Sequence, residues 1–128
     1  MIIGVGCDIA EHDITEALNW QSDSNILKRV FSQAELTLYE NQKNKEFLVG
    51  RFAAKEAVLK CLGTGMQDGI SLTDVQILQR ESGKPIIEVQ GEVKKISNHL
   101  GIESWHISIS HCSDYSFAFV VAEGSKTN

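Results

Sequence analysis

The pattern of apolar and polar positions predicts strands at both ends of the chain. The first stretch, "IIGVGCDI", is almost continuously apolar and predicts a buried strand that ends near Asp8. Near the other end, "WHISISH" (105–111) alternates, and its parity places Ile107, Ile109 and His111 on one face. The apolar stretch "SFAFVVAE" predicts the last strand.

Two shorter strands and five helices are predicted between these ends. "VQILQR" (75–80) and "PIIEV" (85–89) are strand-like, and "ESGK" between them suits a tight turn. The apolar spacing predicts helices over 11–21, 25–31, 33–41, 45–62 and 91–100. "SQAE" (32–35) is a capping box, and Gly63 is a natural stop for the longest helix.

This order of elements predicts the α+β class. One small antiparallel-type sheet should pack against the long helix, within a single domain over residues 1–128.

Composition narrows the class of protein. Of the 128 residues, 42% are hydrophobic and 23% are charged, as in ordinary globular domains, and no apolar run reaches the ~18–20 residues of a membrane span. The N-terminal stretch lacks a basic segment, so we expect no signal peptide.

The three cysteines lack metal-type spacing, which favours reduced, mostly buried thiols in a cytoplasmic protein. A net charge of −5 argues against general nucleic-acid binding, and we expect neither nucleic acid nor membrane as a partner.

Positive charge is concentrated in the middle of the chain. No Lys or Arg precedes Lys28, whereas five cations follow closely at Lys43, Lys45, Arg51, Lys55 and Lys60. This distribution is compatible with a local anion site, but composition alone favours a solvated helix face.

Two carboxylates carry candidate chemistry, each with a plain structural alternative. Asp8 either caps the following helix or acts as a ligand at the end of its strand. Glu56 lies four residues before Lys60, and a routine surface pair of this kind contributes only ~0.2–0.5 kcal/mol. The alanines around Glu56 would let the helix approach another backbone or a bulky ligand.

The glycine-rich stretch "LGTGMQDGI" (62–70) and His111 are similarly ambiguous. Glycine-rich loops bring backbone amides to phosphates, but this one follows its helix and matches no Walker A motif, so a helix cap and turn is the alternative. His111 suits either a structural or a catalytic role, and Ser108 and Ser110 lie in no nucleophile elbow.

Taken together, three stretches carry a specific resemblance. "GVGCDIAE", "FLVGRFAAKEAVLKCLGTG" and "HISISHCSDYSFAFVV" occur in this order and spacing, and the combination resembles the bacterial holo-[acyl-carrier-protein] synthases, the small 4′-phosphopantetheinyl transferases. The resemblance covers essentially the whole chain, including "SGKP" (82–85).

The resemblance implies a set of site residues. It gives Asp8 and Glu56 as ligands of Mg²⁺, and Asp8, Glu56, Lys60 and His111 as the catalytic group. It implies that the coenzyme A site is formed by Lys43, Arg51, Lys60, Gly63, Thr64, Gly65, Gly83, Lys84, Pro85, Ser108 and His111. Glu35 or a metal-bound water would take the proton of the acceptor serine.

The implied reaction belongs to fatty acid biosynthesis. The phosphopantetheine arm of coenzyme A would pass to a serine of an apo acyl carrier protein, with release of 3′,5′-ADP. The small members of the family are homotrimers with active sites between subunits, and we expect the same here. Their first helix is commonly basic, whereas this chain has Glu11, Asp13 and Glu16 there. A coenzyme-A-binding module without transfer and a metal-dependent coenzyme A pyrophosphatase are the alternatives.

Overall fold

The computed structural model describes residues 1–65 and 69–125. A long strand, β1 (Ile2–Glu11), is followed by the helices α1 (Ile14–Ala17), α2 (Ser24–Val30), α3 (Gln33–Glu40) and α4 (Lys45–Leu62). A short 3₁₀ turn, η1 (Leu72–Asp74), leads into β2 (Val75–Gln79) and β3 (Pro85–Val89). The helix α5 (Gly91–His99) precedes two long strands, β4 (Ile102–His111) and β5 (Tyr115–Gly124).

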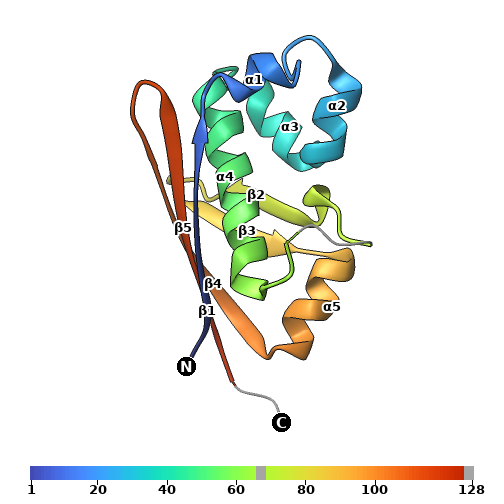
Figure 1. The fold of residues 1–128 in the computed structure, drawn as a ribbon, viewed down its shortest axis with the longest axis vertical. Coiled ribbons are helices and arrows are strands. Elements are labelled where there is room, and N and C mark those ends of the chain that lie inside the picture. The colour runs from blue at the N-terminus through green and yellow to red at the C-terminus, as the bar shows by residue number, and fades with distance from the viewer. Residues whose placement is uncertain (66–68, 126–128) are drawn as a thin grey trace.

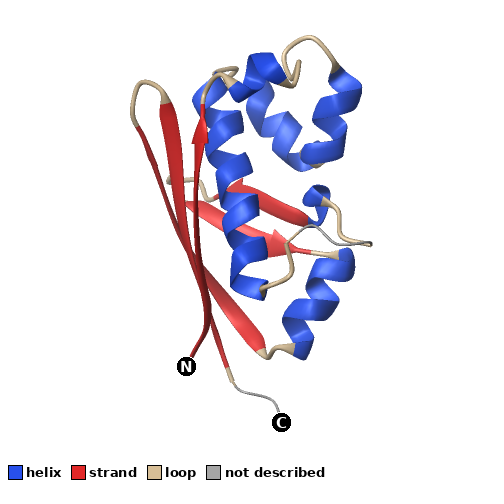
Figure 2. Cartoon of the chain, viewed as in Figure 1, coloured by secondary structure: helices blue, strands red, loops and turns tan. Residues whose placement is uncertain are grey.

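The α+β class is confirmed, but the strands form two antiparallel sheets instead of one. Strand β5 lies between β1 and β4 in the larger sheet, while β2 and β3 pair only with each other among the described residues. Helix α4 crosses the inner face of the larger sheet, and α1, α2 and α3 gather at one end of it (Figures 1 and 2).

The predicted helix over 11–21 is mostly wrong. Strand β1 continues to Glu11, which pairs with Tyr115, and α1 covers only Ile14–Ala17. The pairing with β5 extends the strand past the point where the apolar run ends, because backbone hydrogen bonds across the sheet are available to polar residues as well. The other helices lie within two residues of their predicted bounds.

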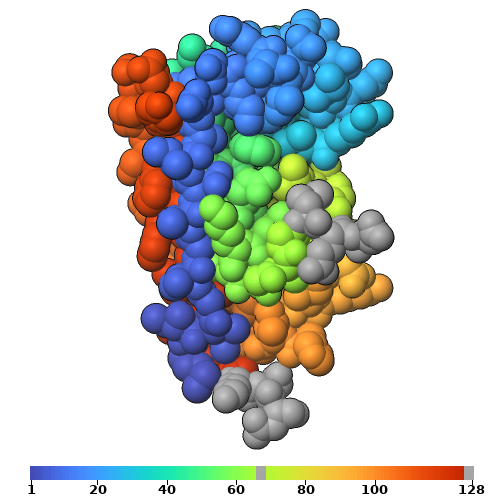
Figure 3. Space-filling view, in the orientation of Figure 1, coloured from blue at the N-terminus to red at the C-terminus, as the bar shows by residue number. Residues whose placement is uncertain are grey.

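Two glycines let β1 lie directly on α4. A Cβ built on Gly6 would come within 2.1 Å of the Ala57 carbonyl oxygen, and one on Gly4 within 2.4 Å of the Cys61 carbonyl oxygen. Ala53, Ala54 and Ala57 are fully buried in the same packing. The alanines therefore allow the backbone of β1 to lie close to α4. The sequence had left open whether they accommodate another backbone or a bulky ligand. Figure 3 shows the resulting contact, with the blue first strand running beside the green helix.

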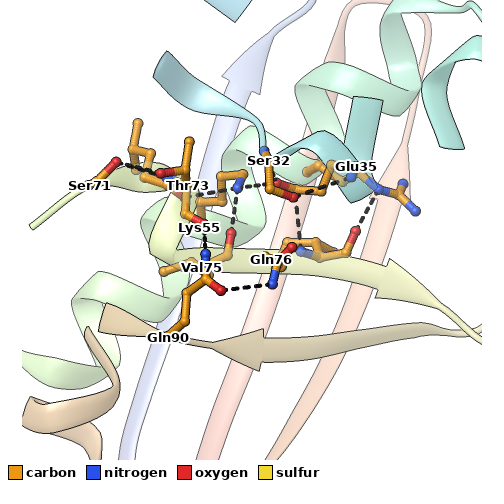
Figure 4. Close-up of polar contacts among 11 residues, drawn as sticks. Ser32, Glu35, Lys55, Ser71, Thr73, Val75, Gln76 and Gln90 are labelled. Carbon is orange, nitrogen blue, oxygen red and sulfur yellow. Dashed lines mark hydrogen bonds and ion pairs between the residues drawn. The ribbon is translucent and has the colours of Figure 1, made fainter. Parts of the chain in front are cut away.

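A buried ion pair joins α3, α4 and β2 (Figure 4). The Lys55 ammonium donates to Glu35 Oε1 at 2.6 Å and also to the carbonyl oxygens of Leu72 and Val75. The second oxygen of Glu35 accepts from the Ile77 amide at 3.0 Å. Glu35 also completes the predicted capping box by accepting from the Ser32 amide. Both side chains of the pair are fully buried, so all of these bonds compensate lost hydration.

No helix of the part of the chain that the structure describes covers the outer face of the larger sheet (Figure 1). The odd-numbered residues of β5 and their neighbours on β1 present large apolar side chains there. Each of the following is at least 40% exposed: Ile2, Val5, Ile9, Tyr115, Phe117 and Phe119. Cys7 is also exposed, as is Cys112 at the β4–β5 turn, so of the three free thiols only Cys61 is buried. The expectation of mostly buried cysteines was wrong.

Candidate functional site

Asp8 and Lys60 meet where β1 crosses α4. The Lys60 ammonium lies 3.1 Å from Asp8 Oδ1 and donates a second bond to the Cys7 carbonyl oxygen at 2.9 Å. The Asp8 side chain faces α4 because Asp8 shares its face of β1 with Gly6. The proposed role of Asp8 as a helix cap is not observed, since Asp13 is the residue before α1.

Glu56 lies one helical turn before Lys60 and lines the same hollow as Asp8. Burial raises the pKa of Glu56, and the neighbouring Asp8 carboxylate raises it further, while Lys60 acts in the opposite direction. Two carboxylates that repel each other, with a single cation beside them, form a site that an added cation would stabilise.

The glycine turn begins directly after this group. Gly63 ends α4 with φ 74°, and Gly65 has φ 60°, so both lie in the left-handed region that favours glycine. A Cβ at either position would meet no atom of residues 1–65 or 69–125 within 4 Å, so among these residues the left-handed backbone, and not crowding, favours glycine here. Thr64 is the residue between them. Residues 66–68 of the stretch 62–70 lie outside the described residues.

A separate cleft of about 780 Å³ opens on the other side of α4. Six of the predicted coenzyme residues line it, namely Arg51, Gly83, Lys84, Pro85, Ser108 and His111. The other eight lining residues were not anticipated from the sequence, namely Gln42, Asn44, Glu46, Phe47, Gly50, Gln79, Ile107 and Ile109. Of these, Gly50 could have been recognised from the sequence, because glycine inside a long helix is unfavourable unless something packs closely against it.

Arg51 is a largely buried cation in the wall of this cleft. Its guanidinium donates to the Ile77 carbonyl oxygen at 2.9 Å and to Gln79 Oε1 at 3.0 Å, and it stacks over the Phe47 ring at 3.6 Å. Burial lowers the pKa of Arg51 to about 10, so the group still carries its charge at neutral pH. The orientation of Arg51 is therefore fixed before any ligand arrives.

His111 closes one end of the cleft and packs against Gly50. A Cβ on Gly50 would lie 2.8 Å from His111 Cε1, so the missing side chain makes room for the ring. His111 Nδ1 lies 2.7 Å from the Ser116 hydroxyl. Burial lowers the pKa of His111, as do His12 and Arg51, while Glu46 opposes them.

Three charged residues that were singled out in the sequence form ion pairs with other side chains of the protein. Glu35 is buried against Lys55, so of the two candidate bases it is not positioned to take a proton from a serine. Lys55 itself belongs to the buried pair and not to an anion site. Lys43 is exposed after α3 and pairs with Glu40 at 3.2 Å, next to the cleft residues Gln42 and Asn44.

The predicted site residues therefore form two groups within one chain. Asp8 and Glu56 line one hollow with Lys60 beside them, and the residues around Arg51 and His111 line another.

Comparison with known proteins identifies the family. The family model described as the 4′-phosphopantetheinyl transferase superfamily matches residues 4–120. The chain therefore belongs to the 4′-phosphopantetheinyl transferase superfamily.

Individual relatives narrow the class further. The chain is 42% identical to the holo-[acyl-carrier-protein] synthase of Hydrogenovibrio crunogenus over 124 residues, covering 96% of this chain and 98% of that protein. It is 38% identical to the corresponding synthase of a Vibrio cholerae strain, with the same coverage of both.

Solved structures of holo-[acyl-carrier-protein] synthases have the same fold as this chain. The holo-[acyl-carrier-protein] synthase of Neisseria meningitidis superposes with a TM-score of 0.86 at 32% identity, covering 96% of this chain and 99% of that one. The Bacillus anthracis synthase, solved in complex with CoA (3′,5′-ADP), gives 0.78 at 33% identity, covering 98% and 99%.

Two further observations bear on cofactors and surroundings. Among residues 1–65 and 69–125, no three His, Cys, Asp or Glu side chains gather into a metal cage. None of the helices in the described part of the chain is long and apolar enough to span a membrane.

Proposed function

We propose that residues 1–128 act as one domain that transfers the 4′-phosphopantetheine group of coenzyme A to a serine of an apo acyl carrier protein. The products are holo-carrier protein and 3′,5′-ADP, and the reaction is Mg²⁺-dependent and cytoplasmic. The observation that carries the proposal is the Asp8–Glu56–Lys60 group beside the glycine turn, in a chain of this family.

The carboxylates fit Mg²⁺ without a complete protein cage. Mg²⁺ is usually bound through one or two carboxylates together with substrate phosphates and water, so Asp8 and Glu56 suffice. Their shared hollow and the raised pKa of Glu56 support the assignment. When bound there, Mg²⁺ would neutralise phosphate charge and act as a Lewis acid.

The remaining residues would bind and orient coenzyme A. Lys60, once Asp8 turns to the metal, is free to donate to the reacting phosphate, and Gly63, Thr64 and Gly65 provide an open backbone next to it. Arg51 and Lys84 supply positive charge in the cleft, while Gly83, Pro85 and Ser108 line its walls. Lys43, after release from Glu40, would reach the phosphates at the cleft entrance. Phosphoryl transfer of this kind depends on alignment and charge neutralisation.

We further propose that the chain forms a homotrimer with active sites between subunits. The uncovered apolar face of β1 and β5 supports this, because monomeric proteins rarely expose so many large apolar side chains together. The separation of the two groups of site residues also supports it. A second copy would bring the cleft of one subunit to the carboxylates of the next.

Release of 3′,5′-ADP, measured with and without apo acyl carrier protein, tests this proposal. Release that requires both the carrier protein and Mg²⁺ is the expected result. Release with Mg²⁺ alone would instead identify a coenzyme A pyrophosphatase. Binding of coenzyme A without any release across several carrier proteins would leave a binding module.

A further inference from the structure

Three side chains form a hydrogen-bonded series at one end of the larger sheet. His12 follows β1, Ser116 lies on β5, and His111 ends β4. His12 Nε2 lies 2.8 Å from the Ser116 hydroxyl, and His111 Nδ1 lies 2.7 Å from the same oxygen. The strand register produces this meeting, since Ser116 pairs with Ala10 on one side and with His111 on the other.

The far end of the series sets the direction of every bond. His12 Nδ1 lies 3.0 Å from the Ser113 carbonyl oxygen, and a carbonyl can only accept, so Nδ1 carries a proton. His12 is buried, and the neutral form of its ring carries a proton on only one of the two nitrogens. Its Nε2 is then an acceptor, and the single proton of the Ser116 hydroxyl is donated to it.

The consequence for His111 follows from the same count of protons. The Ser116 hydroxyl donates its only hydrogen in the bond to His12. Its oxygen must therefore accept a hydrogen bond from His111, so His111 Nδ1 must carry a proton. A neutral His111 therefore has its lone pair on Nε2. That edge of the ring packs over Gly50, and both residues line the cleft.

We propose that His12 and Ser116 are positioning residues that hold neutral His111 as the Nδ1–H tautomer, with the Nε2 lone pair presented to the coenzyme cleft. At neutral pH His111 then accepts a hydrogen bond from an N–H or O–H group of the ligand. The identity of that ligand as coenzyme A rests on the proposed function, whereas the tautomer does not.

The surroundings of His111 agree with a neutral ring. The groups that act on it are His12 at the end of β1, and Glu46 and Arg51 on α4. Burial, His12 and Arg51 all disfavour the imidazolium, and only Glu46 favours it.

Nitrogen-15 NMR of the histidine rings in the ligand-free protein tests the tautomer directly. His106 provides an internal reference, because its Nε2 donates to Glu123 at 2.9 Å and must carry a proton. In their neutral forms, His12 and His111 should both show a protonated Nδ1 and an unprotonated Nε2, opposite to His106. A protonated Nε2 on neutral His111 would overturn the proposal, whether or not any variant folds.

Ser116→Ala then tests the coupling. The variant should release His111 toward the Nε2–H tautomer and weaken coenzyme A binding roughly 5–10-fold, the loss of one oriented hydrogen bond. Ser110→Ala is the matched control, since it removes an exposed hydroxyl from β4, the strand of His111, on the face opposite to His111. A tautomer change with unaltered coenzyme A affinity, or no tautomer change at all, would contradict the proposal. If the wild-type protein bound no coenzyme A, the proposed function would fail while the tautomer result stood.

Discussion

The Lys60 ammonium and the Asp8 carboxylate lie 3.1 Å apart across the contact between α4 and β1. Asp8 is the better protected partner, with a side chain 20% exposed against 55% for Lys60. A half-exposed pair of this kind contributes little to stability, about 0–1 kcal/mol. The pair matters for the arrangement of the proposed site, because it places a cation and a carboxylate next to Glu56 and the glycine turn.

Replacing either carboxylate should separate activity from folding. Asp8→Ala and Glu56→Ala each remove a proposed metal ligand without removing a core side chain, so transfer should fall at least 100-fold while the thermal midpoint stays within a few degrees. Turnover at saturating Mg²⁺ and a melting curve without metal are the two measurements. Near-normal Mg²⁺-dependent turnover in either variant would show that the metal site is assigned wrongly.

The uncovered sheet face should be required for assembly. Phe119 is 44% exposed on that face, so Phe119→Glu should leave the subunit folded but shift the mass in light scattering from trimer to monomer. Activity should fall with it, because in the proposed trimer each site needs residues from two subunits. Leu18→Glu is a fitting control, as Leu18 is also 44% exposed but lies after α1, away from the sheet. A fully active Phe119→Glu monomer would refute intersubunit sites.

Much of this arrangement was predictable from the sequence, and the failures have physical causes. The helix α4 and its stop at Gly63 follow from local spacing and capping, so both were predicted correctly. The length of β1 was not, because it depends on pairing with β5, more than 100 residues away. Glu35 and Lys55 were misjudged for a similar reason, since burial of a charged pair is decided by tertiary packing and leaves no periodic signal.

Lys55 should be essential for stability although it contacts no proposed ligand. Lys55→Met leaves the buried carboxyl group of Glu35 without its cation, which should cost about 3–5 kcal/mol in free energy of unfolding. Urea denaturation at fixed protein concentration measures the loss. Lys94→Met, an exposed lysine on α5, serves as the comparison and should change stability by less than about 0.5 kcal/mol. An equally small loss for Lys55→Met would mean that the pair is dispensable.

Gly6→Ala should damage the site through the backbone. The new Cβ would meet the Ala57 carbonyl at 2.1 Å, so β1 must move away from α4 and carry Asp8 away from Glu56. We expect a loss of several kcal/mol, or a folded protein with strongly weakened Mg²⁺ binding. Gly83→Ala is a useful comparison for stability, because its Cβ would meet nothing within 4 Å and only the strain of φ 89° applies. A stable Gly6→Ala protein with unchanged Mg²⁺ affinity would argue against the close approach.

His111 should contribute a measurable pH dependence of stability. Its folded-state pKa is lowered from the ordinary value of 6.5, mainly by burial, so the unfolded chain takes up a proton more readily. The associated stability is present above pH 6.5 and is lost as the pH falls through 6.5 and then through the folded-state pKa. Unfolding of the wild type and His111→Gln at pH 7.5 and 5.5 should show a smaller loss in the variant. Equal losses in both would exclude this titration.

Intact-mass spectrometry of an apo acyl carrier protein tests the central claim most directly. The carrier protein is incubated with this chain, coenzyme A and Mg²⁺, with parallel samples that contain EDTA or Asp8→Ala. We predict that the carrier gains the mass of one phosphopantetheine group, and that this gain disappears in both parallel samples. An equal gain in EDTA, or no gain on any of several carrier proteins while coenzyme A still binds, would contradict the account.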